Sequence, residues 1–337
     1  MESVVSCQWF PACSGCSAIG MSYGEQLATK LEQVRQLFVE AGIPGFDVDR
    51  MTKIHPSERV SGYRNRVRLV PAYKSPRSEV NRNSPSPTGG ATTKGDGIAL
   101  GLYREDSHVV VDIPQCPVHT AEINRVLEDI RSGIESAGLR IYDESTHRGD
   151  LRFVTVRQGI NTGELLVGLV TRTDSRAGVQ EVADHIVSRN AKVEGVLQNI
   201  NPRPGNVVFG AKTTLLTGRE YLEELVCDVR IRLGLTSFFQ VNTGVAEQAY
   251  RAIQDGLMLS ADDVLLDLYC GVGSIGLTTA RHVSKVIGIE EVGEAVHFAI
   301  DAARANGIRN AEFQVGKVED RLPRLVKHLQ REGHTSA

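Results

Sequence analysis

Apolar residues recur along the first two thirds of the chain with two spacings, and each spacing predicts a different kind of element. Over residues 23–42 they return every three or four positions, which predicts an amphipathic helix ended by Gly42. The same spacing predicts helices over 120–138 and 179–190. Short runs with strand character occur at residues 64–73, 98–103, 109–113, 151–158, 164–171 and 193–199. We therefore expect residues of about 55–225 to form an α+β domain built on antiparallel sheet.

The last third of the chain has a more regular rhythm, in which strands and helices alternate across short turns. The predicted strands are 264–269, 285–290 and 311–315, and the predicted helices are 274–282, 294–306 and 322–332. This alternation is typical of a parallel, doubly wound sheet. Three strands are few for such a sheet, and the first of them would normally have a further neighbour.

Residues 74–97 interrupt both patterns. Ser, Pro, Gly, Asn and Thr dominate this stretch, and Val80 is its only large apolar residue. Such a composition buries too little apolar surface to offset the entropy lost on ordering. We predict a flexible insertion.

Composition narrows the class of protein. The 337 residues suffice for two or three domains, and 41% of them are hydrophobic and 23% charged, as in ordinary globular proteins. No apolar run approaches the roughly 20 residues that span a bilayer, and the N-terminus lacks a secretory signal, so we expect a cytoplasmic protein with no membrane partner.

The net charge of −3 hides a local excess of basic residues. Residues 56–77 carry six basic side chains and a single acid, Glu58. Such a stretch is able to neutralise phosphates, although by itself a solvated basic face explains it more simply.

A glycine-rich turn in the last third of the chain is a candidate ligand-binding site. Gly271, Gly273 and Gly276 follow a predicted buried strand and open a helix, so backbone amides are able to approach a ligand closely. Nicotinamide, flavin and S-adenosyl-L-methionine (SAM) sites all use such turns. Asp267, four residues earlier, is placed to reach a methionyl ammonium, and Glu290 closes the next strand, where it is placed to bind ribose hydroxyls. These two carboxylates favour SAM.

Three cysteines at the N-terminus suggest a metal. Cys7, Cys13 and Cys16 lie within ten residues, which is unlike the spread of a disulfide framework. Thiolate ligands suit an iron–sulfur cluster or a structural zinc, and the spacing barely separates the two.

Several blocks along the chain resemble the RNA (uracil-5-)-methyltransferases, which make 5-methyluridine in ribosomal and transfer RNA. These blocks are CQWFPACSGC, GYRNRVRL, IPQCPVH, TGELLVGLVT, SFFQVNTGVAEQAY, LDLYCGVGSIGL and VIGIEEVGEAV. The resemblance implies SAM contacts at Gln240, Tyr269, Ser274 and Glu290, beside the turn glycines Gly271 and Gly273, and a further contact at Lys317, where other members have different polar residues. It also implies that Phe238 lies near the flipped-out base.

The resemblance extends to the metal. One branch of the family holds a [4Fe–4S] cluster with the same three N-terminal cysteines and a distant cysteine before proline, which Cys116 matches. The implied ligands are therefore Cys7, Cys13, Cys16 and Cys116, with zinc as the alternative metal.

The catalytic blocks of the family do not occur in the sequence. Relatives use a cysteine thiolate that adds to carbon 6 of uracil so that carbon 5 attacks the methyl group, and then a base that removes the carbon 5 proton. The Asp-Pro-Pro-Arg and Ser-Cys-Asn-Pro blocks that belong to this chemistry are missing before Ala337. We expect a chain that is truncated, decayed or completed by a partner, with no catalytic residue of its own and no activity as written.

The predicted fold class is α/β: an incomplete class I (Rossmann-like) methyltransferase domain preceded by an α+β central domain and an N-terminal cysteine-cluster loop. The expected boundaries are 1–22 for the loop, 23–225 for the central domain and 226–337 for the partial methyltransferase domain. The expected function, by resemblance, is SAM-dependent methylation of uridine carbon 5 in ribosomal or transfer RNA. The alternatives are a non-catalytic iron–sulfur RNA-binding protein and a SAM methyltransferase with another substrate.

Overall fold

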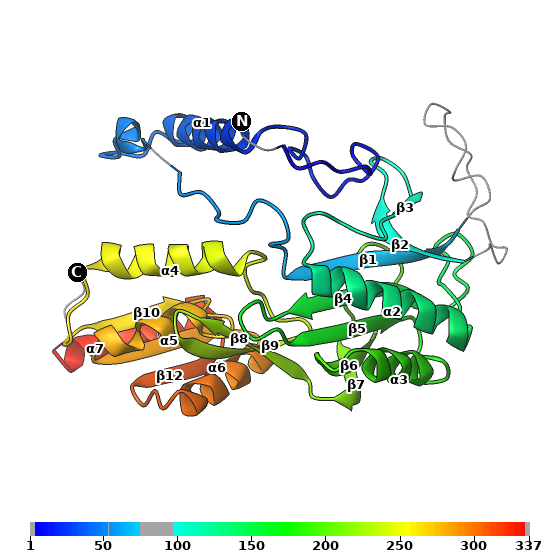
Figure 1. Cartoon of the computed structure of the whole chain (residues 1–337). Helices are drawn as coiled ribbons and strands as arrows, with labels where there is room; N and C mark the ends of the chain where they lie inside the picture. Colours follow the sequence, from blue (N-terminus) through cyan, green and yellow to red (C-terminus); the bar gives the residue numbers. More distant parts are fainter. Residues whose placement is uncertain (1–3, 53, 75–96, 334–337) are drawn as a thin grey trace.

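The computed structural model describes residues 4–52, 54–74 and 97–333, drawn in colour in Figure 1. The predicted flexible insertion, residues 74–97, lies outside the described residues apart from its two ends. Of the described helices, none is both long and apolar enough to cross a membrane.

The N-terminal part of the chain consists of a loop that carries three cysteines and the helix α1 (Tyr23–Ala41). Ser22 caps this helix together with Glu25, and Gly42 ends it in the left-handed conformation, as predicted. All of α1 is described, and none of its residues is buried. A short 3₁₀ turn, η1 (Val48–Arg50), follows it.

The central region is a mixed sheet that has seven strands among the described residues, in the order β3-β2-β1-β4-β5-β6-β7 (Figure 1). The strands are β1 (Arg66–Tyr73), β2 (Ile98–Tyr103), β3 (Val110–Asp112), β4 (Leu151–Gln158), β5 (Leu165–Thr171), β6 (Val193–Ile200) and β7 (Lys212–Gly218). Neighbours are antiparallel except β5 and β6. The expected antiparallel pairing is confirmed for the other neighbours, and β5 and β6 are parallel because the helix α3 connects them as a crossover.

Two helices cover one face of this sheet, α2 (Ala121–Ala137) and α3 (Val179–Arg189). Thr120 caps α2 by accepting the Ile123 amide, and Gly138 ends it. The buried core between sheet and helices includes Val67, Leu69, Val154, Val156, Ile123, Ile130, Ile134, Val182 and Ile186. Side chains of the intervening strand residues point to the opposite face.

A hairpin packs against that opposite face, formed by β8 (Tyr221–Val226) and β9 (Val229–Gly234). Its core joins Leu166 of the central sheet to Leu222 and Ile231 of the hairpin and continues into the C-terminal region. The expected domain boundary, between residues 225 and 226, falls inside β8.

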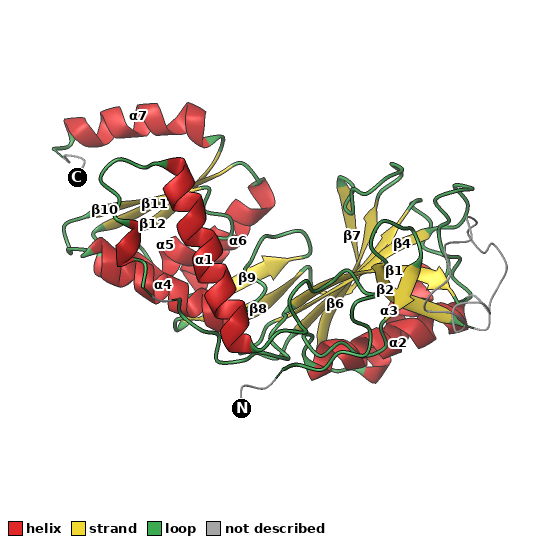
Figure 2. Ribbon diagram, turned by 90° about the horizontal axis from the view of Figure 1, so that it is seen from above, coloured by secondary structure: helices red, strands yellow, loops and turns green. Residues whose placement is uncertain are grey.

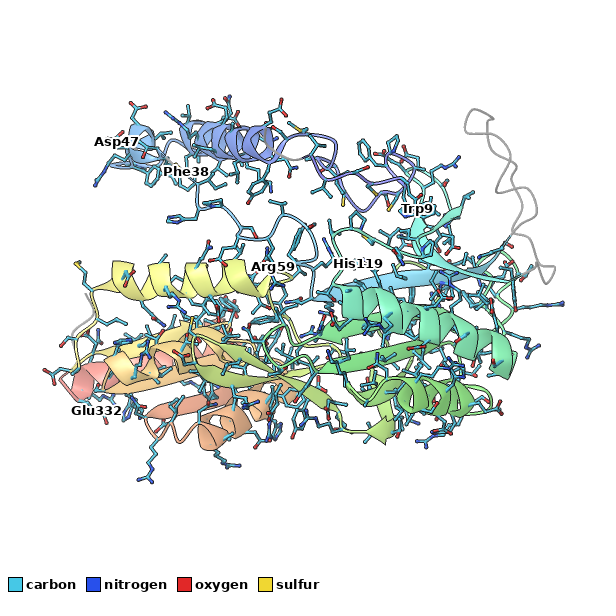
Figure 3. The ribbon with its side chains drawn as sticks, viewed as in Figure 1. Trp9, Phe38, Asp47, Arg59, His119 and Glu332 are labelled. Atoms are coloured by element: carbon cyan, nitrogen blue, oxygen red, sulfur yellow. The ribbon has the colours of Figure 1, made fainter. Side chains whose placement is uncertain are left out.

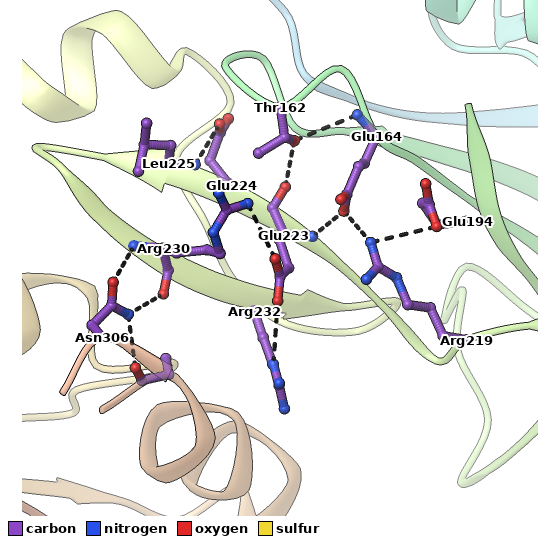
Figure 4. A network of polar contacts seen from close by, with 11 residues as sticks. Thr162, Glu164, Glu194, Arg219, Glu223, Glu224, Leu225, Arg230, Arg232 and Asn306 are labelled. Carbon is purple, nitrogen blue, oxygen red and sulfur yellow. Dashed lines mark hydrogen bonds and ion pairs between the residues drawn. The ribbon is translucent and has the colours of Figure 1, made fainter. Parts of the chain in front are cut away.

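The hairpin is fastened to the central sheet by a buried carboxylate, that of Glu224, which Figure 4 labels on β8. Glu224 is fully buried. Its Oε2 accepts hydrogen bonds from the Ile160 amide (2.7 Å) and the Thr243 hydroxyl (3.0 Å), and its Oε1 accepts from the amides of Asn161 (3.0 Å) and Leu225 (2.9 Å). Burial raises the pKa of Glu224, and the four donors oppose that rise.

The C-terminal region is a parallel sheet with three described strands, in the order β10-β11-β12 (Figure 2). Its elements are α4 (Thr243–Leu257), β10 (Val264–Leu268), α5 (Ser274–Thr279), η2 (Ala280–His282), β11 (Lys285–Glu290), α6 (Gly293–Ala305), β12 (Ala311–Val315) and α7 (Val318–Arg331). The predicted strand–helix alternation is confirmed. The carboxyl ends of its strands meet at one edge of the sheet.

Candidate cofactor site

The turn after β10 holds an unusual backbone conformation. Tyr269, Gly271 and Gly273 have φ angles of 58°, 56° and 73°, in the left-handed region. A Cβ on Gly273 would lie 2.7 Å from the Phe313 ring and 3.0 Å from Ala299, so this position requires glycine for space as well as for conformation. The tight turn places backbone amides at the edge of the sheet.

Glu290 ties this turn to the next strand end. It is the last residue of β11, and its Oε2 accepts the Gly271 amide at 3.1 Å while its Oε1 accepts the Val292 amide at 2.9 Å. The structure therefore brings together two residues that the sequence predicted for one site.

Asp267 lies within β10, two residues before Tyr269, where the turn begins. Its side chain is buried, and its Oδ2 accepts the Gly276 amide at 2.8 Å. Burial raises the pKa of Asp267 to about 6, against the lowering effect of the Gly276 hydrogen bond. Its Oδ1 has no hydrogen-bonding partner among the described residues, which leaves one oxygen available to a ligand.

Tyr269 and Lys317 follow the first and third strands of the parallel sheet. Tyr269 is 66% exposed, and its hydroxyl donates to Glu319 Oε1 at 2.6 Å, in the first turn of α7. Lys317 directly precedes that helix. Both therefore lie at the same carboxyl edge as Glu290, which is where ligands bind in open parallel sheets.

Ser274 begins α5, and its hydroxyl lies 2.9 Å from the hydroxyl of Tyr250 on α4. Tyr250 is buried, so this contact fixes the Ser274 hydroxyl against the core. Sequence reasoning missed this role, because nothing in the spacing of Tyr250 indicates that it reaches a residue 24 positions later.

Gln240 lies on the segment that links β9 to α4, and Asn65, the residue before β1, holds that segment. The backbone amide of Asn65 donates to Val241 O (2.9 Å), and its side-chain amide donates to Gln240 O (2.8 Å) and Thr243 Oγ1 (3.0 Å). The Gln240 side chain is exposed and has no hydrogen-bonding partner in the described part of the chain. The structure thus fixes the backbone of Gln240 and leaves its side chain exposed.

Two buried arginines also hold this segment. Arg66 donates to the carbonyls of Leu235 and Ser237, each at 3.1 Å, and Arg157 donates to the same Ser237 carbonyl. The next residue, Phe238, is 73% exposed. Its aromatic ring is therefore presented on a backbone that is fixed from one side. The tertiary contacts of Asn65, Arg66 and Arg157 left no signal in the sequence pattern.

The four candidate metal ligands, Cys7, Cys13, Cys16 and Cys116, line one cavity of about 380 Å³. Trp9 donates to Gln115 O at 3.0 Å and so fastens the N-terminal loop beside Cys116; Figure 3 labels this tryptophan. Burial and the neighbouring thiols raise the pKa of Cys13, Cys16 and Cys116. Within the described ranges, however, no group of three or more such side chains is arranged to hold a metal ion. The four thiols therefore share one cavity without being arranged as a metal-ligand set in this structure.

Comparison with known proteins agrees with this architecture. Residues 259–331 match the family model described as "Methyltransferase domain". Uncharacterised RNA methyltransferases of Halalkalibacterium halodurans and of Nostoc sp. are 32% and 33% identical to the chain, over 94% and 93% of its length. The chain spans 64% of the length of each.

One solved structure covers nearly the whole fold. It is the tRNA (uracil-54, C5)-methyltransferase of Pyrococcus abyssi in complex with S-adenosyl-L-homocysteine, which aligns with 91% of this chain and 66% of its own at a TM-score of 0.67 and 23% identity. At that identity, the similarity shows a shared fold and nothing more.

The parallel sheet and its glycine-rich edge define a Rossmann-like methyltransferase domain. Along nearly its whole length, the chain is homologous to proteins named RNA methyltransferases. This homology confirms the resemblance to that family on which the sequence prediction rested.

Proposed function

We propose that the chain binds SAM at the carboxyl edge of the parallel sheet, and that the protein methylates carbon 5 of uridine in ribosomal or transfer RNA. The observation that carries the proposal is that Glu290 bridges the glycine-rich turn and the next strand end. The names of the relatives support an RNA substrate, and the name of the Pyrococcus enzyme supports uracil as the target base.

Each residue of the edge has a role in the proposal. Glu290 accepts hydrogen bonds from the two ribose hydroxyls, and Asp267 Oδ1 accepts the methionyl ammonium. The amides around Gly271 and Gly273 approach the ligand closely. The remaining cofactor contacts are Gln240, Tyr269, Ser274 and Lys317. SAM supplies the methyl group when bound, and the residues named here bind and orient it.

No described cysteine is assigned as the nucleophile. Cys227 and Cys270 are buried, and burial, reinforced by Asp267 and Glu290, raises the pKa of Cys270 well above the ordinary range. Such a thiol does not supply the thiolate that the reaction needs at neutral pH. We therefore propose that these residues alone do not form the covalent RNA adduct.

Transfer of tritiated methyl groups tests the proposed reaction. Unmodified ribosomal and transfer RNA are incubated with labelled SAM, once with this chain and once with the chain joined to the C-terminal part of a relative. We expect the joined protein to place the label in 5-methyluridine after digestion to nucleosides. Label in another nucleoside or in protein would contradict the proposal, and RNA binding without transfer would favour a non-catalytic RNA-binding protein.

We further propose, on the resemblance, that Cys7, Cys13, Cys16 and Cys116 hold a [4Fe–4S] cluster, with zinc as the alternative. In its favour stands the arrangement of four thiols on one cavity. A thiolate set of this kind suits either metal.

Metal analysis of protein purified without oxygen tests the cluster. We expect stoichiometric iron and sulfide with visible absorption in the unmodified chain, and loss of both in Cys116→Ser. Cys227→Ala, which removes a buried cysteine outside the cavity, should keep its iron. Zinc in place of iron would establish the alternative, and metal-free protein with all four cysteines reduced would refute the site.

A further inference from the structure

The cavity beneath the N-terminal loop has a cationic wall. Arg64, Arg66 and Arg68 line it. Arg66 and Arg68 alternate along β1, so their side chains leave the same face of the sheet, and Arg64 lies two residues before that strand. The described residues that line the cavity include no carboxylate. The four candidate metal ligands line the same cavity, so the arginines would adjoin the proposed cluster.

No carboxylate of the described residues balances the positive charge of the three arginines. Among the described residues, none of these three guanidinium groups forms an ion pair with a carboxylate. Arg66 is only 9% exposed, and its Nε has no hydrogen-bonding partner. Arg157, directly opposite Arg66 on β4, is a second buried cation. Burying like charges side by side is unfavourable, and a bound anion would relieve the cost.

Aromatic side chains accompany the arginines. Trp9 and Phe10 of the N-terminal loop and Phe238 of the linking segment line the same cavity, and Phe10 is 40% exposed. Phe209 stacks against Arg68, with the guanidinium carbon 5.1 Å from the ring centre. Cations that follow a phosphate backbone beside aromatic platforms for bases are typical of single-stranded nucleic-acid sites, whereas a free phosphate needs no aromatic ring.

We propose that Arg64, Arg66 and Arg68 form a phosphodiester-binding row, which holds the RNA strand where it passes between the N-terminal loop and Phe238. The inference rests on the proposed function, because it takes RNA as the substrate. Arg66 has a double role: its Nη atoms hold the Leu235 and Ser237 carbonyls while it contributes charge to the row. RNA bound at the row would therefore contact an arginine that also holds the segment carrying Phe238 and Gln240.

Binding of a short labelled single-stranded RNA to the full chain, measured by fluorescence anisotropy over a range of salt concentrations, tests the row. In Arg64→Gln/Arg68→Gln we expect the affinity to fall about tenfold or more, since the variant no longer neutralises two phosphates. The slope of log affinity against log salt should decrease by about 1.4, roughly 0.7 for each phosphate that the variant no longer neutralises. Arg64→Lys/Arg68→Lys keeps both charges and should retain most of the affinity, even where the Gln variant folds poorly.

Arg125→Gln/Arg189→Gln is the matched control, because it makes the same charge change at exposed positions on the two helices that cover the other face of the sheet. RNA affinity equal in the two Gln variants would overturn the proposal. So would binding of inorganic phosphate at the row without any effect of the row on RNA. If the row binds RNA but no methyl group is transferred, the proposed reaction is refuted and the row is supported. If methyl groups are transferred but Arg64→Gln/Arg68→Gln binds RNA as the unmodified chain does, the row is refuted and the reaction is supported.

Discussion

Glu290→Ala is expected to weaken SAM binding by about 100-fold or more. The carboxylate accepts two ribose hydroxyls in the proposed complex, each hydrogen bond to a charged group contributes roughly 1.5–3 kcal/mol, and 1.4 kcal/mol corresponds to tenfold. The same carboxylate fixes the turn through the Gly271 and Val292 amides, so the variant also loses preorganisation. Isothermal titration calorimetry gives the affinity directly.

Two further variants make this result specific. Glu291→Ala makes the same charge change one residue later, at an exposed position, and should bind SAM as the unmodified chain does. Glu290→Gln keeps one acceptor oxygen and should lose about tenfold, the effect of one hydrogen bond. Equal SAM affinities for Glu290→Ala and Glu291→Ala would show that Glu290 does not bind SAM.

Glu224→Ala is expected to lower the free energy of unfolding by about 3–5 kcal/mol. Four donors then remain buried without a partner, and each unsatisfied group costs roughly 1–3 kcal/mol before relaxation. The loss falls at the join between the hairpin and the central sheet, where Ile160, Asn161 and Thr243 meet the carboxylate. Urea unfolding followed by circular dichroism measures the change.

Glu223→Ala is the matched control, one residue earlier on the same strand. Its carboxylate pairs with Arg230 at 3.2 Å and Arg232 at 3.6 Å, contacts that are partly open to solvent (Figure 4). Pairs of that kind contribute roughly 0–1 kcal/mol each. Glu224→Gln should not rescue the fold, since each carboxylate oxygen accepts two donors and an amide NH₂ would face them. Similar losses for Glu223→Ala and Glu224→Ala would show that burial of the carboxylate does not determine its importance.

The elements with strong periodicity could be predicted from the sequence because local residues determine them. The helix ending at Gly42 and the helix between Thr120 and Gly138 have side-chain caps at the start and left-handed glycines at the end. The strand–helix alternation of the last third likewise follows from buried apolar runs separated by short turns.

The sequence pattern did not predict the hairpin β8–β9, for two physical reasons. Glu224 occupies an inward-facing position, so the apolar alternation of β8 is broken by a charge that only tertiary donors can satisfy. The turn places Cys227 and Asp228 at positive φ, 46° and 65°, where hairpins usually signal themselves with glycine or asparagine. Strand β7 is largely solvent-accessible and shows no alternation either.

The site was predictable only as far as topology determines it. Residues at strand ends, such as Tyr269, Glu290 and Lys317, share an edge in any parallel sheet, so their sequence positions sufficed. The contacts of Asn65 with Gln240 and of Tyr250 with Ser274 join separate elements, and no local pattern encodes them. The metal ligands remain a prediction from the resemblance.

Titration of the purified chain with SAM between about pH 5 and pH 8 tests the central claim, that this edge binds the methyl donor. Asp267 has a raised pKa of about 6, and only its ionised form accepts the methionyl ammonium. The affinity should therefore be constant well above pH 6 and fall about tenfold by pH 5, in proportion to the ionised fraction. In Asp267→Asn the affinity should be weaker and should lose this pH dependence. Absence of SAM binding at every pH would contradict the account.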